Sequence, residues 1–200
     1  MALLSICPKR AVNVVLQARP RATVWTDASA ELRPPHLVQT VSLCYLIVWD
    51  SGRRVGGIAE LPDAIVHSFA DRHTYIAHGE AFAPLLALYH ESEALRGHSV
   101  LWFLDNLGVL SAFCTGSSTV ADFGCLVHAC LLRFAALQIA AWFEHVDSAA
   151  NAADGGTRGS SLVAEQLGIA LPTCSLPPWP RDVMQASASE WLALMQHQWR

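Results

Sequence analysis

The stretch VQTVSLCYLIVWDSGRRVGGIAEL, residues 38–61, holds the strongest β-strand signal in the chain. Its first half is a run of β-branched and aromatic residues, residues 50–53 (DSGR) have the composition of a tight turn, and apolar residues resume after the turn. This pattern predicts an antiparallel hairpin. Gly56 and Gly57 lie inside its second strand, where glycine indicates a bulge or the close approach of another segment.

The segments on either side of the hairpin alternate between strand and helix patterns. Before it, ATVWTDASA (22–30) is β-type, and the two prolines of ELRPPH (31–36) predict a loop. After it, the predicted elements are a helix over 78–97, a buried strand over 98–106, helices over 107–115 and 119–136, and a strand over 137–146. This order predicts a mixed α/β sheet that begins as an antiparallel meander and carries helices on its faces.

One position in the first long helix conflicts with regular helical geometry. Pro84 has no amide hydrogen, and the ring of a proline clashes with the carbonyl group four residues earlier, which here belongs to Glu80. We therefore expect the helix either to begin near residue 83 or to kink there.

The composition is that of a folded protein with one domain. Of the 200 residues 52% are hydrophobic and 15% charged, and the formal net charge is −4. That charge argues against binding to nucleic acid through bulk charge, but not against binding through a local basic patch and metal ions. We expect an N-terminal arm over 1–20, a domain over 21–164, and a C-terminal tail over 165–200 that contains prolines and a short helix.

Cysteine usage and hydropathy indicate where the protein resides. Six cysteines without a CxxC pair indicate a reducing, intracellular setting and no structural zinc. The N-terminal apolar stretch is too short for a secretory signal. The longest apolar stretch, 123–143, contains His128 and Arg133, and an arginine near the centre of a membrane span costs roughly 2.5 kcal/mol or more. We predict a protein of the cytoplasm or nucleus that does not enter a membrane.

Four acidic residues stand in strands, at strand ends or at helix starts of this pattern: Asp27, Glu80, Asp105 and Asp154. Such positions can meet at one edge of a mixed sheet. Carboxylates held together repel one another unless divalent cations neutralise them, and oxygen-only ligands favour Mg²⁺ or Mn²⁺ over zinc. Two ions roughly 4 Å apart in such a site can activate a water and stabilise the leaving oxygen in phosphodiester cleavage.

Each acid also has a simpler interpretation. Asp27, followed by Ala-Ser, fits a turn that ends a strand, and Glu80 fits a helix N-terminus, where the dipole favours negative charge. Asp105, with Asn106 after it, and Asp154 both fit helix N-caps. The spacing of the four acids does not decide between these interpretations and a shared site.

The four acids lie in motifs whose order along the chain is more informative than any of them alone. The motifs are VWTDAS (24–29), YIAHGEAFAPLLAL (75–88), LRGHSVLWFLDNLGVLSAF (95–113) and HVDSAANAADGGTRG (145–159). Together they resemble the ribonuclease H-like domain of retrotransposon reverse transcriptases, most closely the group with tyrosine-recombinase (DIRS-like) elements. The resemblance covers roughly residues 22–160. Its most specific part is the last motif, Ser-x-x-Asn-x-x-Asp-x-x-(Ser/Thr)-Arg, formed by Ser148, Asn151, Asp154, Thr157 and Arg158.

The resemblance implies a fold, a site and a reaction. The fold is an RNase H-like mixed five-stranded sheet, antiparallel over its first three strands and then parallel, with helices on both faces. The metal-binding and catalytic residues are Asp27, Glu80, Asp105 and Asp154, which bind two Mg²⁺ or Mn²⁺ ions. The reaction is hydrolysis of the RNA strand of an RNA·DNA hybrid, recognised through shape and 2′-hydroxyl contacts. Expected nucleic-acid contacts are Ser29, Asn106 and Arg158, the last suited to a phosphate.

Two other functions remain open from the sequence. The chain has no Tyr/Phe-x-Asp-Asp signature of a polymerase, so a polymerase domain, if one is a partner, is missing from this chain. An RNase H-like fold without activity would serve as a nucleic-acid or protein-binding module, which the net acidity and Pro84 favour. A nuclease or transposase of the same fold would cut DNA instead, because a fold alone does not fix the chemistry.

Overall fold

The computed structural model describes residues 18–33, 38–71, 73–177, 179, 187 and 189. Five strands form one sheet in the order β3-β2-β1-β4-β5. The strands are β1 (Arg21–Arg33), β2 (Val38–Trp49), β3 (Arg54–Leu61), β4 (Ser99–Leu104) and β5 (Ala140–His145). The helices are α1 (Asp63–Val66), α2 (Ile76–Leu95), α3 (Leu107–Thr115), α4 (Ala121–Ala136), α5 (Asp154–Thr157) and α6 (Leu162–Gln166), with a 3₁₀ turn over Ser148–Ala150.

The directions of the strands confirm the predicted fold class. β2 is antiparallel to both β1 and β3, whereas β4 is parallel to β1 and β5 is parallel to β4. The hairpin over 38–61 forms as predicted, with Tyr45 opposite Gly57, and its turn contains Gly52 at a φ of +88°. The result is a mixed five-stranded sheet in which the antiparallel strands come first in the sequence.

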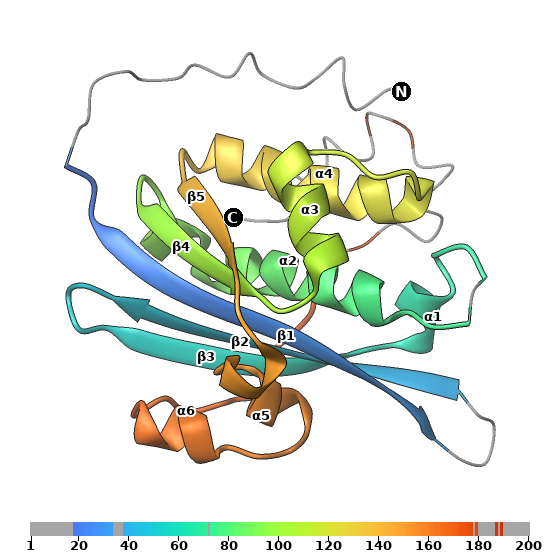
Figure 1. Ribbon diagram of the computed structural model, residues 1–200, viewed down its shortest axis with the longest axis horizontal. Coiled ribbons are helices and arrows are strands. Elements are labelled where there is room, and N and C mark those ends of the chain that lie inside the picture. The colour runs from blue at the N-terminus through green and yellow to red at the C-terminus, as the bar shows by residue number, and fades with distance from the viewer. Residues whose placement is uncertain are drawn as a thin grey trace.

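Helices cover both faces of the sheet (Figure 1). On one face, alternate residues of β2 such as Leu43 and Ile47 are fully buried in the core that α2 and α4 complete. On the other face, Leu46 packs with Ala164 of α6 and with Ile169. This two-sided burial follows from the period of two in a strand, which sends neighbouring side chains to opposite faces.

Three local predictions differ from the structure. β1 continues to Arg33, so Glu31 to Arg33 belong to the strand and not to a loop. α2 begins at Ile76 and includes Pro84, so the helix does not begin near residue 83. The interruption lies at Glu91, with φ −115° and ψ 18°, and not at Pro84. Tertiary packing overrides the local preference of proline here, because α2 is almost completely buried around Pro84.

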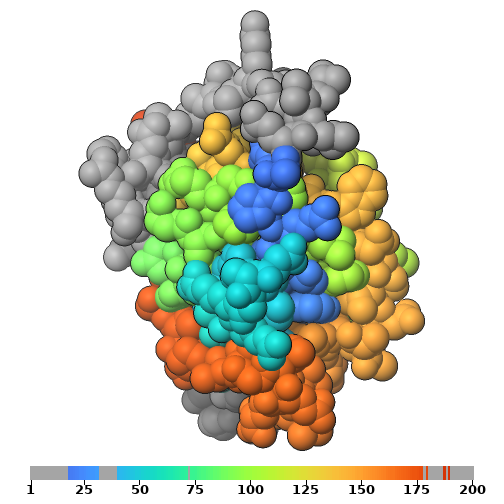
Figure 2. Space-filling model, turned by 90° about the vertical axis from the view of Figure 1, so that its left-hand side faces the viewer, coloured from blue at the N-terminus to red at the C-terminus, as the bar shows by residue number. Residues whose placement is uncertain are grey.

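The chain after α6 crosses the free edge of β3, and we call residues 167–179 the C-terminal strap. The Ile58 amide donates to the Pro172 carbonyl at 3.0 Å, and the Cys174 amide donates to the Ile58 carbonyl at 2.7 Å. Figure 2 shows this part of the chain (orange) directly against the β2–β3 hairpin (cyan). The strap thus covers an edge strand that would otherwise expose unpaired backbone groups. The predicted domain boundary at residue 164 lies inside α6.

The strap explains the two glycines of β3. A Cβ atom on Gly56 would lie 2.7 Å from Leu46 Cδ2 and 2.8 Å from Ile169 Cγ2, and one on Gly57 would overlap Cys174 Sγ. Of the two predicted alternatives, the close approach of another segment is confirmed.

Some predictions fall on residues that lie partly or wholly outside the described ranges. Most of the predicted N-terminal arm, including Lys9 and Arg10, and the predicted C-terminal helix around Trp191 lie outside the described residues. Arg19 is described, and its guanidinium donates to the Gln138 carbonyl at 2.7 Å. Among the described helices, none has both the length and the apolar character that crossing a membrane would require.

Candidate active site

Asp27 lies in the middle of β1, the central strand of the sheet, and only 3% of it is exposed. Strand alternation places it on the same face as Trp25 and Ser29, the face that α5 covers. The interpretation of Asp27 as a turn residue is wrong, because the strand continues for six residues beyond it, to Arg33.

Glu80 lies in the second turn of α2 and is buried. The interpretation that it only favours a helix N-terminus is wrong, because the helix begins at Ile76 and the effect of the dipole fades after the first turn. The preceding residue, Gly79, lets the helix approach the sheet closely, since a Cβ atom there would lie 2.5 Å from Val41 Cγ1 and 2.9 Å from Ala28 Cβ. Glu80 is therefore held next to β1 by the packing of α2.

Asp105 follows the last residue of β4, as predicted. β4 is parallel to β1, and their last paired residues are Trp25 and Phe103, so Asp27 and Asp105 each follow that pair by two residues in the same direction. The Asp105 Oδ1 atom is buried and accepts no hydrogen bond from the described part of the chain. A buried carboxylate oxygen without a donor is uncommon. The neighbouring Glu80 carboxyl group can donate a hydrogen bond to the Asp105 side chain when it is protonated, which is one cause of its raised pKa.

Asn106 has a structural task beside Asp105. Its side-chain oxygen accepts hydrogen bonds from the amides of Gly108 and Val109 at 3.0 and 3.2 Å, so Asn106 and not Asp105 is the N-cap of α3. Its amide nitrogen donates to Glu80 Oε1 at 3.4 Å. Both ends of the side chain are thus used within the protein, and its role is to orient Glu80 and start α3.

Asp154 begins α5, as predicted, but it does not cap that helix; the N-cap position belongs to Ala153. Its Oδ1 accepts a hydrogen bond from Arg158 Nε at 2.8 Å in an ion pair. The side chain of Arg158 is 64% exposed and that of Asp154 is 27% exposed. Arg158 is therefore the site residue placed best to reach a ligand from solvent.

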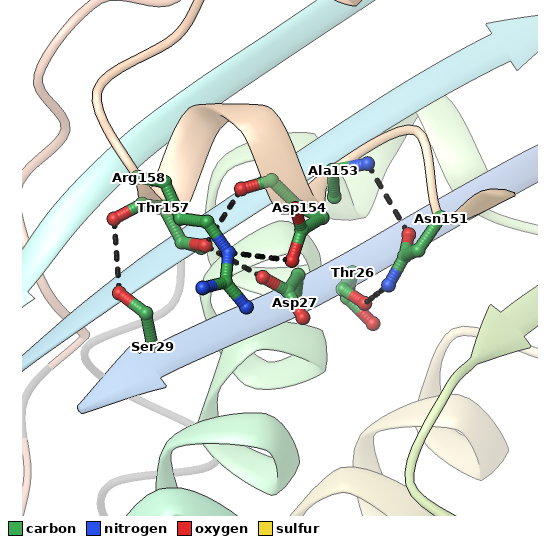
Figure 3. A network of polar contacts seen from close by, with 8 residues as sticks. All are labelled: Thr26, Asp27, Ser29, Asn151, Ala153, Asp154, Thr157 and Arg158. Carbon is green, nitrogen blue, oxygen red and sulfur yellow. Dashed lines mark hydrogen bonds and ion pairs between the residues drawn. The ribbon is translucent and has the colours of Figure 1, made fainter. Parts of the chain in front are cut away.

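Three side chains attach the segment around Asp154 to β1 (Figure 3). Asn151 is buried and donates to the Thr26 carbonyl at 3.1 Å, and Ser29 donates to the Thr157 carbonyl at 2.9 Å. The Thr157 hydroxyl lies 2.6 Å from Asp27 Oδ2. Ser29 was predicted to contact nucleic acid, but it is buried and its proton is used by α5. The sequence motif included Thr157 without assigning it a role.

Burial and neighbouring charges shift the pKa of two of the four acids, Asp27 and Glu80. The pKa of Asp27 is raised to about 6, mainly by burial and also by the charges of Asp105 and Asp154, against the opposing hydrogen bond from Thr157. Burial raises the pKa of Glu80 to about 8, followed by the charge of Asp105. The pKa of Arg158 is raised, first by its hydrogen bond to Asp154 and also by the charges of Asp27 and Asp105. Asp27 therefore lies within electrostatic reach of Asp105, Asp154 and Arg158, and Glu80 lies within reach of Asp105 and Asp27.

The donor set suits a hard divalent cation. It offers carboxylate oxygens only, and one of them, Asp105 Oδ1, is buried without a hydrogen bond. Within the described residues, however, no three Asp, Glu, His or Cys side chains stand close enough together to hold a metal ion as they are. Asp154 is engaged by Arg158 and Asp27 by Thr157. A cation would therefore compete with Arg158 for Asp154 Oδ1, and it would reach Asp27 through the oxygen that Thr157 does not hold.

We expect glycine at position 156 to be essential for the close packing of α5 against β2. A Cβ atom at this position would overlap Cys44 Sγ and lie 3.2 Å from Cys44 Cβ, in the fully buried surface of β2. We expect Gly156→Ala to destabilise the protein by roughly 1–3 kcal/mol, the usual cost of overpacking, and to shift Asp154 away from Asp27. Thermal and urea unfolding measure the loss.

A second substitution tests the stated cause. In the double variant Cys44→Ala/Gly156→Ala the sulfur is gone, so part of the lost stability should return. If the two substitutions are simply additive, the overlap with Cys44 is not the reason for glycine at position 156.

The chain is similar to known proteins in structure but not in sequence. No protein-family model matches the chain, and no curated protein matches it in sequence. The RNase H1 of the halophilic archaeon Halobacterium salinarum NRC-1 is similar with 16% identity and a TM-score of 0.46, over 66% of this chain and 89% of that protein. LC9-RNase H1, a type 1 RNase H with the type 2 active-site motif, has 13% identity and a TM-score of 0.47, over 76% of this chain and 74% of that protein. Both TM-scores are below 0.5, so neither structure supports an inference about the function of this chain.

Proposed function

We propose that this protein is an RNase H-like, divalent-cation-dependent nuclease that hydrolyses the RNA strand of RNA·DNA hybrids. One observation carries the proposal: the charges of Asp105 and Asp154 act on Asp27, the charge of Asp105 acts on Glu80, and the buried Asp105 Oδ1 accepts no hydrogen bond within the described chain. The pKa of Glu80 is about 8, because the ionised carboxylate is unfavourable in its buried position unless a proton or a cation neutralises it. Such tuned acids are common at functional sites.

Each residue has a proposed role in this reaction. Bound Mg²⁺ or Mn²⁺ would supply an activated water and a stabilised leaving oxygen. Asp27, Glu80, Asp105 and Asp154 provide the oxygen ligands. Arg158, exposed and paired only with Asp154 in the described structure, exchanges that carboxylate for a phosphate oxygen of the substrate strand.

The hybrid substrate and the origin of the chain rest on the four sequence motifs. Their order supports descent from a retroelement of the DIRS-like group, and a polymerase domain outside this chain is the partner that this descent implies. The proposed substrate is read by shape, through backbone and 2′-hydroxyl contacts, so cleavage should not depend on base sequence.

The competing proposal is an inactive module of the same fold that binds nucleic acid or protein. One observation favours it: Arg158 occupies Asp154 Oδ1, an oxygen that a cation would need. The two proposals differ in one measurable respect, since only the nuclease turns over substrate when a divalent cation is added.

Cation removal is the decisive experiment. We expect the purified protein to cleave a labelled RNA·DNA hybrid in millimolar Mg²⁺ or Mn²⁺, to stop when EDTA is added, and to resume when the cation is restored. The same assay with double-stranded DNA and double-stranded RNA tests the substrate. Hybrid that stays intact in both cations contradicts the nuclease, and faster cleavage of duplex DNA would assign the site to a DNA-cutting enzyme instead.

A further inference from the structure

The hydroxyl of Thr157 makes the shortest side-chain contact to any of the four acids. Thr157 belongs to α5 and is buried, and its Oγ1 lies 2.6 Å from Asp27 Oδ2 on β1. The same oxygen lies 2.9 Å from the Asp154 carbonyl. A hydroxyl has one proton, and a carboxylate is the stronger acceptor at the shorter distance, so the proton goes to Asp27 when that acid is ionised.

We infer that Thr157 is a positioning residue, whose hydroxyl fixes one oxygen of Asp27 so that the other oxygen is presented to a divalent cation shared with Asp105. The inference rests on the proposed function, because it assigns Thr157 a part in the same site. It adds a residue for which the sequence motif gave no role.

The surroundings of Thr157 make it a fixed support. Its carbonyl accepts a hydrogen bond from Ser29 at 2.9 Å, and Ser29 lies two residues after Asp27 on the same face of β1. Thr157 is therefore held to β1 by its backbone while its side chain holds Asp27 (Figure 3). The support comes from the central strand of the sheet and from the buried residue of α5, and packing of this kind keeps a ligand in one orientation.

Ser29 also offers a matched control. Ser29→Ala and Thr157→Val each remove one buried hydrogen bond between β1 and α5, but only Thr157→Val removes a contact to a carboxylate. Thr157→Ser keeps the hydroxyl and loses only a methyl group. A purely structural role predicts the same consequences for Ser29→Ala and Thr157→Val, whereas a positioning role separates them.

The first measurement needs no activity and no cation. The χ1 rotamer of Asp27 is obtained by NMR from three-bond couplings in wild type and in the three variants. We expect one rotamer in wild type, Thr157→Ser and Ser29→Ala, and rotamer averaging in Thr157→Val. A single unchanged rotamer in Thr157→Val overturns the inference, whether or not the protein proves to be a nuclease.

The second measurement is Mn²⁺ affinity, followed by titration calorimetry or by paramagnetic broadening of the Asp27 and Asp105 signals. We expect Thr157→Val to weaken Mn²⁺ binding by about 10- to 100-fold, as the loss of a partner that orients a metal ligand typically does. Thr157→Ser should restore most of the affinity. Ser29→Ala, which leaves the Thr157 hydroxyl on Asp27, should weaken binding less than Thr157→Val does. Equal losses of Mn²⁺ affinity in Ser29→Ala and Thr157→Val would show that Thr157 has a structural role only.

The two proposals fail separately. Absence of hybrid cleavage by wild type contradicts the nuclease but leaves the rotamer and Mn²⁺ results to decide the role of Thr157. Cleavage by wild type together with full Mn²⁺ affinity in Thr157→Val supports the nuclease and rejects the positioning role.

Discussion

Asp105→Asn is expected to reduce hydrolysis of an RNA·DNA hybrid by about 1,000-fold or more while leaving the fold intact. The substitution replaces an anionic ligand with a neutral amide of the same shape, at the acid whose Oδ1 is buried without a donor in the described chain. A 1,000-fold loss corresponds to ~4 kcal/mol of transition-state stabilisation, within the several kcal/mol that metal-ion catalysis supplies. Initial cleavage rates at saturating Mg²⁺ measure the loss.

Stability provides the control for this variant. Asn at position 105 keeps the shape of the side chain and removes a charge that repels Asp27 and Glu80, so the melting temperature should not fall. Asp147→Asn is a matched control, because Asp147 is an exposed acid in the segment that leads to Asp154. Its cleavage rate should equal that of wild type. A rate for Asp105→Asn within tenfold of wild type would remove Asp105 from the catalytic site.

Glu80→Gln is expected to stabilise the cation-free protein by a few kcal/mol at pH 8, although it removes a proposed ligand. Burial raises the pKa of Glu80 from 4.5 to about 8, so the folded state binds its proton more tightly than the unfolded state does. The stability that this proton contributes is fully present below pH 4.5 and is lost as the pH rises to 8, at roughly 1.4 kcal/mol for each pH unit. Glutamine stays neutral and avoids that loss.

The pH profile distinguishes this cause from a general improvement in packing. The gain in unfolding free energy from Glu80→Gln should be near zero at pH 4.5, grow up to pH 8, and then stay constant. Glu93→Gln is the control on the same helix: Glu93 is exposed and its pKa is lowered, first by a hydrogen bond from Arg96, so its substitution should not stabilise the protein. A gain for Glu80→Gln that is independent of pH would contradict the raised pKa.

Much of the fold followed from local sequence patterns. The hairpin over 38–61 and the helix over 107–115 are recognisable because strand and helix periodicities, turn residues and chain length act over a few neighbouring residues. The boundaries of α2 and the course of residues 167–179 did not follow from such patterns. Pro84 predicted a break that buried packing removes, and the strap is fixed by pairing with Ile58, more than a hundred residues earlier in the chain.

The candidate site divides in the same way. The sequence by itself singled out Asp27, Glu80, Asp105 and Asp154, because acids at strand ends and helix starts in a fixed order form a pattern that can be read along the chain. Only the tertiary structure excluded the simpler interpretation of each acid as a turn, helix-start or N-cap residue. It also showed that Ser29 is buried and that Thr157 contacts Asp27, 130 positions earlier in the sequence. Hydrogen bonds, burial and the pKa of a carboxyl group depend on which distant residues the fold brings within a few ångströms, and no local pattern contains those distances.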